Sequence, residues 1–164
     1  MKKNKIIASA AAIIFVVFGV FMIGTTSVSA QEAPDFTLTD IEGNEVSLSD
    51  FKGKVIIVDF WATWCGPCKM EIPSFIKLQD DYQDDVVVLG VSLDQGGPSA
   101  VVPFAKKMNI NYPIVYGDGN VVQAYGGIRG IPTTFVIDRE FNIQRKYVGY
   151  TDHNVFEKDI LAFK

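Results

Sequence analysis

The sequence predicts an α/β protein in which helices cover both faces of a mixed β-sheet. Residues 55–62 and 86–93 are largely apolar runs rich in β-branched side chains, a pattern typical of central, fully buried strands, and Asp59 interrupts the first of them. Segments with helical periodicity separate these runs from each other and from a third strand at 113–116. Two more strands and a final helix follow, so the sheet is expected to combine parallel strands with an antiparallel hairpin.

The other elements follow in chain order. Residues 36–48 predict two short strands around a Gly-Asn turn, and residues 47–54 predict a polar turn with room for one helical turn. Pro73 is expected to kink the first long helix, because proline lacks the N–H group and crowds the preceding turn. Thr151 is the expected N-cap of the last helix. The predicted helices are residues 65–82, 99–108, 121–125 and 152–163, and the predicted hairpin strands are residues 133–138 and 143–149.

The first 30 residues have the features of an export segment. Three lysines precede an uncharged apolar run at residues 6–23, and a stretch of small residues ends at Ala30. This pattern describes a cleavable secretory signal, but a run of 18 residues is also about long enough to anchor the chain in a bilayer. Both alternatives stay open, and both place the following residues outside the cytoplasm. We therefore divide the chain into a signal peptide or anchor, residues 1–30, and one domain, residues 31–164.

The predicted domain is acidic. The chain has 15 basic residues, of which three are N-terminal lysines, so 12 basic residues face 19 acidic ones and the net charge is about −7. An acidic domain without a basic stripe argues against nucleic acid as a partner. It also argues against peripheral binding to anionic lipid, so the only expected membrane contact is the N-terminal segment.

The only two cysteines, Cys65 and Cys68, form a Cys-Gly-Pro-Cys motif. A structural zinc site needs four ligands, and the chain offers this pair and one histidine, His153. Attachment of haem would need a histidine at position 69, which is Lys69. A disulfide that closes so short a loop adds little stability, which disfavours a purely structural role. We therefore predict no metal site and no cofactor.

A catalytic dithiol explains the motif better. Cys65 follows a predicted buried strand and begins a helix, so its sulfur is expected near free backbone N–H groups and the positive end of the helix dipole. Both favour the thiolate, the form that attacks disulfides. Pro67 needs no hydrogen bond so early in a helix and stiffens the turn. Cys68, one turn deeper, is expected to resolve the mixed disulfide that Cys65 forms.

Around these residues the sequence resembles the thioredoxin superfamily. The stretch "VDFWATWCGPCK", residues 58–69, is similar to the thioredoxin active site and its surroundings. The opening "APDFTLTDIEGNEVSLSDFKGK" and the stretch "CKMEIPSF" resemble the TlpA/ResA branch, whose members are membrane-tethered or exported thiol–disulfide oxidoreductases. The resemblance implies a thioredoxin-like fold with an N-terminal β-hairpin and a central insertion at about residues 94–126.

The resemblance also implies a function and partners. Several members of the branch serve cytochrome c maturation, which implies a reductase for disulfides of exported proteins such as apocytochromes c. A membrane thiol donor would then resupply electrons. The expected location is the outer face of a bacterial cell membrane or, after cleavage, the secreted or periplasmic space.

Further site residues carry over from the resemblance. Pro132 matches the proline that the superfamily holds in cis opposite the active site, where the backbone of Ile131 would pair with substrate. Asp59 matches a buried aspartate whose pKa burial should raise, which makes it a candidate base for Cys68. Glu71 matches a glutamate of the branch and shares a helix face with Cys68. Predicted substrate contacts are Trp64, Gly66, Pro67, Ile131 and Pro132, while Trp61 is expected to pack in the core.

Two other functions compete with this hypothesis. The opening of the domain also occurs in peroxiredoxins, which are thiol peroxidases. Their signature places proline seven and threonine or serine three residues before the attacking cysteine, but Val58 and Ala62 stand there for Cys65. The second alternative is a non-enzymatic copper-handling or redox-switched module, because thiolates suit Cu(I). Apart from Met70, no histidine or methionine near the motif supports copper binding.

Overall fold

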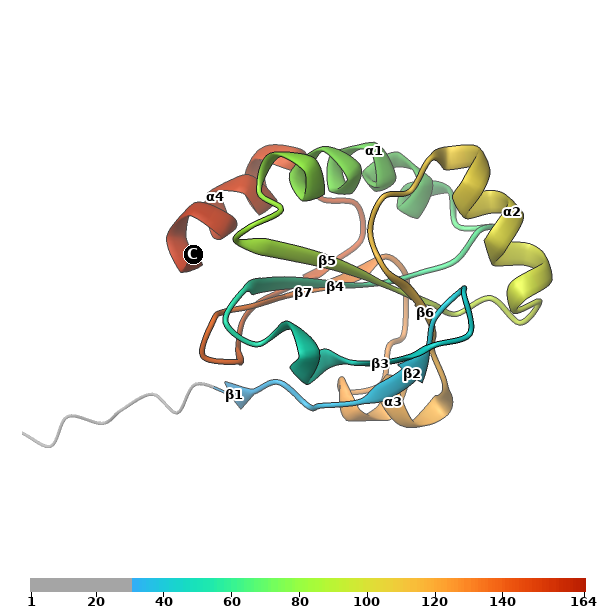
Figure 1. Cartoon of the computed structure of the whole chain (residues 1–164), viewed down its shortest axis with the longest axis horizontal. Helices are drawn as coiled ribbons and strands as arrows, with labels where there is room; N and C mark the ends of the chain where they lie inside the picture. The colour runs from blue at the N-terminus through green and yellow to red at the C-terminus, as the bar shows by residue number, and fades with distance from the viewer. Residues whose placement is uncertain (1–30) are drawn as a thin grey trace, which may run out of the picture.

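The computed structural model describes residues 31–164, which form a mixed β-sheet with helices on both faces (Figure 1). The predictions of a signal peptide or anchor at residues 1–30 lie outside the described residues. Six strands form the main sheet in the order β1-β8-β7-β4-β5-β6. Their bounds are β1 Gln31–Glu32, β4 Val55–Trp61, β5 Val86–Ser92, β6 Ile114–Tyr116, β7 Thr133–Ile137 and β8 Asn142–Val148.

The strand directions confirm the predicted mixture. β4, β5 and β6 are parallel neighbours, whereas β7 pairs antiparallel with both β4 and β8. β1, which the sequence analysis missed, pairs antiparallel with the start of β8. The predicted N-terminal hairpin is confirmed as a separate two-stranded sheet, β2 Thr37–Thr39 and β3 Glu45–Ser47. The 3₁₀ helix η1, Leu48–Phe51, follows it where one helical turn was expected.

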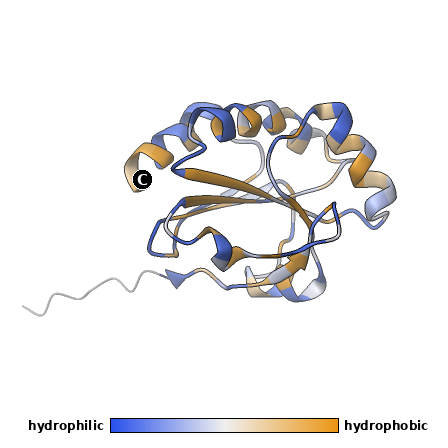
Figure 2. Ribbon diagram, in the orientation of Figure 1, coloured by the Kyte–Doolittle hydropathy of each residue, from blue (hydrophilic) through white to orange (hydrophobic). Residues whose placement is uncertain are grey.

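β4 lies near the centre of the sheet because its side chains are apolar on both faces. All seven of its residues are buried. Ile57 and Trp61 pack into the core on one face, and Val58 and Phe60 pack into the core on the other. Since successive side chains of a strand alternate in direction, Asp59 points to the same face as Ile57 and Trp61. Figure 2 shows the middle strands as hydrophobic, as fully covered strands require.

Three helices cover the face to which Asp59 points. These are α1 Gly66–Asp81, α2 Pro98–Met108 and α4 His153–Phe163, which lie together on one side of the sheet in Figure 1. The short α3, Gly119–Ala124, lies on the other side with the β2–β3 hairpin. The predicted insertion at 94–126 therefore supplies α2, the edge strand β6 and α3.

Two details of the helices bear on the predictions. α1 continues through Pro73, and the predicted kink there stays a prediction. The prediction of Thr151 as N-cap of the last helix is wrong, because Asp152 is the N-cap and makes no side-chain capping bond. Thr151 instead donates its backbone N–H to a buried carboxylate of α1, described below. Within residues 31–164, no helix is both long and apolar enough to cross a membrane.

Candidate active site

Cys65 and Cys68 form a disulfide at the start of α1, so the structure represents the oxidised protein. The loop after β4 brings Cys65 to the N-cap position, where its sulfur accepts a hydrogen bond of 3.2 Å from the backbone N–H of Cys68. α1 has no acidic residue in its first turn. After reduction, the same N–H group and the helix dipole would stabilise a thiolate on Cys65.

Pro132 lies opposite this disulfide. The Ile131–Pro132 peptide bond is cis, and the carbonyl oxygen of Ile131 is 3.6 Å from the Sγ atom of Cys65. A disulfide sulfur carries no proton, so this is a contact and not a hydrogen bond. The carbonyl of Pro132 accepts a hydrogen bond of 2.8 Å from the N–H of Gly149. The structure thus brings together the attacking cysteine and the backbone segment predicted to dock a substrate strand.

Asp59 is buried beneath the active site, as predicted. In the sheet it lies between Gly90 of β5 and Thr134 of β7. The Thr134 hydroxyl donates a hydrogen bond of 3.2 Å to Asp59 Oδ1. Burial raises the pKa of Asp59 well above its ordinary value, and the charge of Glu71 raises it further. A buried carboxyl group whose pKa is raised in this way is a candidate for proton transfer to and from a nearby thiol.

Glu71 is also buried, which excludes the alternative of a solvated surface carboxylate. Its Oε1 atom accepts a hydrogen bond of 2.7 Å from the N–H of Thr151. Its Oε2 atom is buried without a hydrogen-bond partner among the described residues. Burial raises the pKa of Glu71 to about 7, and the bond from Thr151 opposes part of that rise. Because the charge of Glu71 affects Asp59, the two acids titrate as a coupled pair.

Residues 29–146 match the AhpC/TSA family. The chain belongs to the AhpC/TSA family. It is 38% identical over 121 residues to thioredoxin-like protein YneN of Bacillus subtilis, covering 73% of this chain and 71% of that protein. It is 35% identical over 142 residues to thiol-disulfide oxidoreductase ResA of Geobacillus thermodenitrificans, covering 85% and 80%.

The structure of this AhpC/TSA family member is also similar to that of a solved thiol–disulfide protein. The thiol:disulfide interchange protein, a thioredoxin family protein from Chlorobium tepidum, has a TM-score of 0.76 and 31% identity, covering 82% of this chain and 96% of that one. The thioredoxin-like fold and the resemblance to ResA are therefore confirmed. Together with the Cys65–Cys68 disulfide, these relatives make the protein a thiol–disulfide oxidoreductase.

Several apolar side chains of this AhpC/TSA protein are exposed in the active-site region. Trp64 is 68% exposed beside Cys65, as predicted, while Trp61 is buried in the core. Gly66 and Pro67 are also exposed. The sequence analysis did not single out two more exposed side chains, Val148 and Tyr150. Val148 pairs with Thr133, the residue after Pro132. The position of Val148 and Tyr150 near this proline is the only signal that could have indicated them.

The analysis also missed the partners of the two buried acids. Thr134 and Thr151 belong to segments 75 and 80 residues away from Asp59 and Glu71 along the chain. Nothing in their local sequence distinguishes them from ordinary strand and turn threonines. His153 is half-buried, and its Nδ1 atom lies 3.0 Å from the Ser74 hydroxyl.

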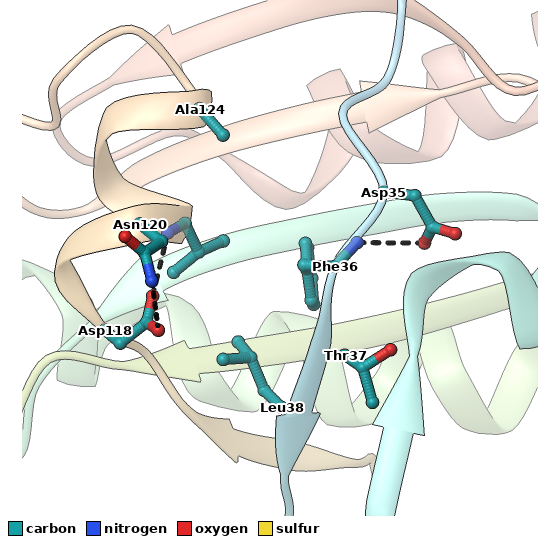
Figure 3. Close-up of a pocket in the computed structure, with 8 residues that line it drawn as sticks. Asp35, Phe36, Thr37, Leu38, Asp118, Asn120 and Ala124 are labelled. Carbon is teal, nitrogen blue, oxygen red and sulfur yellow. Dashed lines mark hydrogen bonds between the residues drawn. The ribbon is translucent and has the colours of Figure 1, made fainter.

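Two hollows in the surface differ in their relation to the disulfide. One lies beside Trp64 and is described below. Figure 3 shows the other, of about 250 Å³, between β2 and α3. Its two carboxylates, Asp35 and Asp118, accept backbone N–H groups and so hold a turn and the start of α3. No cysteine lines this hollow, and it has no part in the thiol chemistry.

Proposed function

We propose that this protein is an exported or membrane-anchored reductase that transfers two electrons from Cys65 and Cys68 to disulfides in proteins outside the cytoplasm. The contact between Cys65 Sγ and the carbonyl of Ile131 is the main support. A substrate chain that paired with this backbone would bring its own disulfide against the attacking sulfur. The geometry therefore favours polypeptide substrates over small peroxides or metal ions.

The reaction proceeds in two exchanges. The Cys65 thiolate attacks one sulfur of the substrate disulfide, forms a mixed disulfide and releases the other substrate sulfur as a thiolate. Cys68 then loses its proton and attacks Cys65 Sγ, which forms the Cys65–Cys68 disulfide and releases the second substrate thiolate. The substrate gains two electrons and leaves as two thiolates, which take up protons from the solvent, and the protein is oxidised to the state that the structure shows.

The buried acids fit the second exchange. Cys68 is almost fully buried, so water has little access to its thiol proton. Asp59 and Glu71 lie on the same side of the sheet and both have raised pKa values. The pKa of Glu71, at about 7, lets this carboxylate accept the proton near neutral pH. We assign the proton transfer to this pair of acids, in which the pKa of Glu71 is raised to about 7.

Apocytochromes c are the proposed substrates, and a membrane dithiol protein is the proposed donor. The support is the similarity to ResA, together with the export features of residues 1–30. A reductase outside the cytoplasm needs electrons from across the membrane, because the oxidised disulfide must be reduced after each turnover. The proposed location is therefore the outer face of the cell membrane.

The decisive measurement is the reduction potential of the Cys65–Cys68 couple, obtained by equilibrating the protein with dithiothreitol or glutathione buffers. A value near about −270 mV, as in thioredoxin, supports a reductant. A value near about −120 mV would mean that the protein installs disulfides, and would overturn the proposed direction. Replacement of Cys65→Ser is expected to abolish reduction of insulin disulfides and of an oxidised apocytochrome c.

The two alternatives have their own tests. Val58 and Ala62, at the positions of the peroxidase signature, are fully buried apolar residues, so they present no polar group to Cys65. Rapid turnover of hydrogen peroxide would nevertheless establish a peroxidase. Tight stoichiometric binding of Cu(I) without disulfide exchange would establish a copper module.

A further inference from the structure

A cavity of about 490 Å³ lies beside the exposed indole of Trp64. Two segments meet here: residues 63 and 64, just before Cys65, and the loop after β5, which includes Leu93, Asp94 and Gln95. The volume is within the range of about 300–1,000 Å³ that is usual for ligand pockets. Because the cavity borders the residue before the attacking cysteine, a substrate held at Cys65 would pass beside it.

The Asp94 carboxylate is fixed in one position in this cavity. Its Oδ2 atom accepts hydrogen bonds from the Thr63 N–H at 2.8 Å and from the Ser92 hydroxyl at 3.0 Å. Its Oδ1 atom accepts a bond of 2.6 Å from the Thr63 hydroxyl. An ionised carboxylate has about four acceptor sites, so one site on Oδ1 is left for a ligand.

The negative charge of Asp94 is also without a protein counter-ion. Within residues 31–164, no lysine or arginine forms an ion pair with it, and no basic residue lines the cavity. The three hydrogen bonds have a structural role, since they tie the turn before α1 to the end of β5. They do not neutralise the charge, which faces a cavity open to solvent.

The other walls suit a long basic side chain. The exposed indole of Trp64 offers an aromatic face, to which ammonium and guanidinium groups are attracted. Leu93 and Ala100 offer apolar surface for a methylene stem. The domain as a whole has a net charge of about −7, which favours approach of a basic segment.

We propose that this cavity is a subsite for a lysine or arginine side chain of the substrate protein, close to the substrate cysteine that Cys65 attacks. The inference rests on the proposed function, because it requires a polypeptide held at Cys65. It names the substrate class: disulfides with a basic residue nearby in the sequence. An acidic residue at the same place would meet the like charge of Asp94 and would be rejected.

The test compares short disulfide peptides that differ in one residue. Lysine, glutamine or glutamate is placed at one of the two positions before or after the reacting cysteine, and kcat/KM is measured with the full chain in detergent. The Asp94→Asn variant keeps the side-chain shape and an acceptor oxygen but removes the charge. The matched control is Asp35→Asn, because Asp35 also accepts two backbone N–H groups but lies outside this cavity.

At one peptide position, the wild type is expected to prefer lysine over glutamine by about 3- to 10-fold. Asp94→Asn should reduce this ratio to about one, and Asp35→Asn should leave it unchanged. In the wild type, 0.5 M salt should also shrink the ratio, which tests the charge without any substitution. Equal ratios in wild type and Asp94→Asn at every position would overturn the subsite. If no peptide were reduced by the wild type, the proposed function itself would fail.

Discussion

The backbone N–H of Thr151 donates a hydrogen bond to the buried Oε1 atom of Glu71, and so ties the segment before α4 to the active-site helix. Two residues earlier, Gly149 donates its N–H to the carbonyl of Pro132. One short segment therefore contacts both the buried acid and the cis proline. A bound substrate that displaces the Pro132 segment would therefore change the surroundings of Glu71, because only two hydrogen bonds link the two sites.

Replacement of Glu71→Gln removes one member of the acid pair and should slow the attack of Cys68. General acid–base catalysis contributes at least about 100-fold to many reactions, and a loss of that order is expected in the release of the second substrate thiolate. In the wild type this step should speed up as pH rises through about 7, where Glu71 loses its proton. The variant should lose that inflection.

The measurement is quenched-flow analysis of the mixed disulfide between pH 5 and 9. Glu157→Gln is the control, because Glu157 is a carboxylate of α4 that accepts a hydrogen bond from Tyr82 outside the active site. A variant at Glu71 with the wild-type rate and pH profile would leave Asp59 as the only candidate base.

Stability of the oxidised protein should fall as pH rises from about 4.5 to about 7. The pKa of Glu71 is raised from 4.5 to about 7 in the folded state, so the folded protein binds more protons than the unfolded chain in this window. For one fully buried carboxylate with this pKa, the free energy of unfolding should fall by up to about 3 kcal/mol across this pH window. Asp59 should add to the decline in the same direction, because its pKa is raised as well.

Urea unfolding at a series of pH values measures this slope. Glu71→Gln should flatten it between pH 4.5 and 7, because glutamine has no proton to exchange. An unchanged slope in that variant would show that other groups cause the pH dependence.

Replacement of Cys68→Ser should trap the substrate on the protein. Cys65 remains able to attack, but no second sulfur is present to release it, so the mixed disulfide accumulates. Mass spectrometry after mixing with an oxidised peptide should find one peptide bound through Cys65. Faster trapping of the peptide by the converse Cys65→Ser variant than by Cys68→Ser would reverse the assigned roles.

Gly90→Ala should destabilise the fold by about 1–3 kcal/mol through overpacking. A Cβ atom at this position would lie 2.9 Å from Nε1 of Trp61 and 3.4 Å from the ring of Tyr112. Gly119→Ala is the control, because a Cβ atom there meets nothing within 4 Å. Urea unfolding of both variants gives the comparison, and equal stabilities would contradict the tight packing beside Asp59.

Strong local patterns allowed most of the fold to be predicted. The apolar, β-branched runs at β4 and β5 predicted strands that are covered on both faces. The Gly-Asn turn predicted the first hairpin. β1 could not be found, because it has two exposed residues and no alternation, and only its pairing with β8 makes it a strand. The wrong N-cap at Thr151 has a similar cause, since the partner of its N–H lies in a distant helix.

The candidate site was likewise predicted only in part. The positions of Cys65 and Cys68 at the start of α1 followed from the motif, and the burial of Asp59 followed from the resemblance to the thioredoxin superfamily. The burial of Glu71 was left open, because helix spacing gives its face but not what covers that face. The cavity at Asp94 was not predicted, since it forms only where the loop after β5 meets Trp64.

The pairing of β1 with β8 also determines how the protein can be oriented toward a partner. β1 contacts only Asn142 and Ile143, at the start of β8, whereas Val148, at its end, lies beside the cis-proline segment. β1 and the start of α1, where the disulfide lies, are therefore at opposite ends of the sheet (Figure 1). In a protein tethered at Gln31, the domain would lie between its point of attachment and the disulfide. The sulfurs would then face proteins that approach from the side opposite the tether.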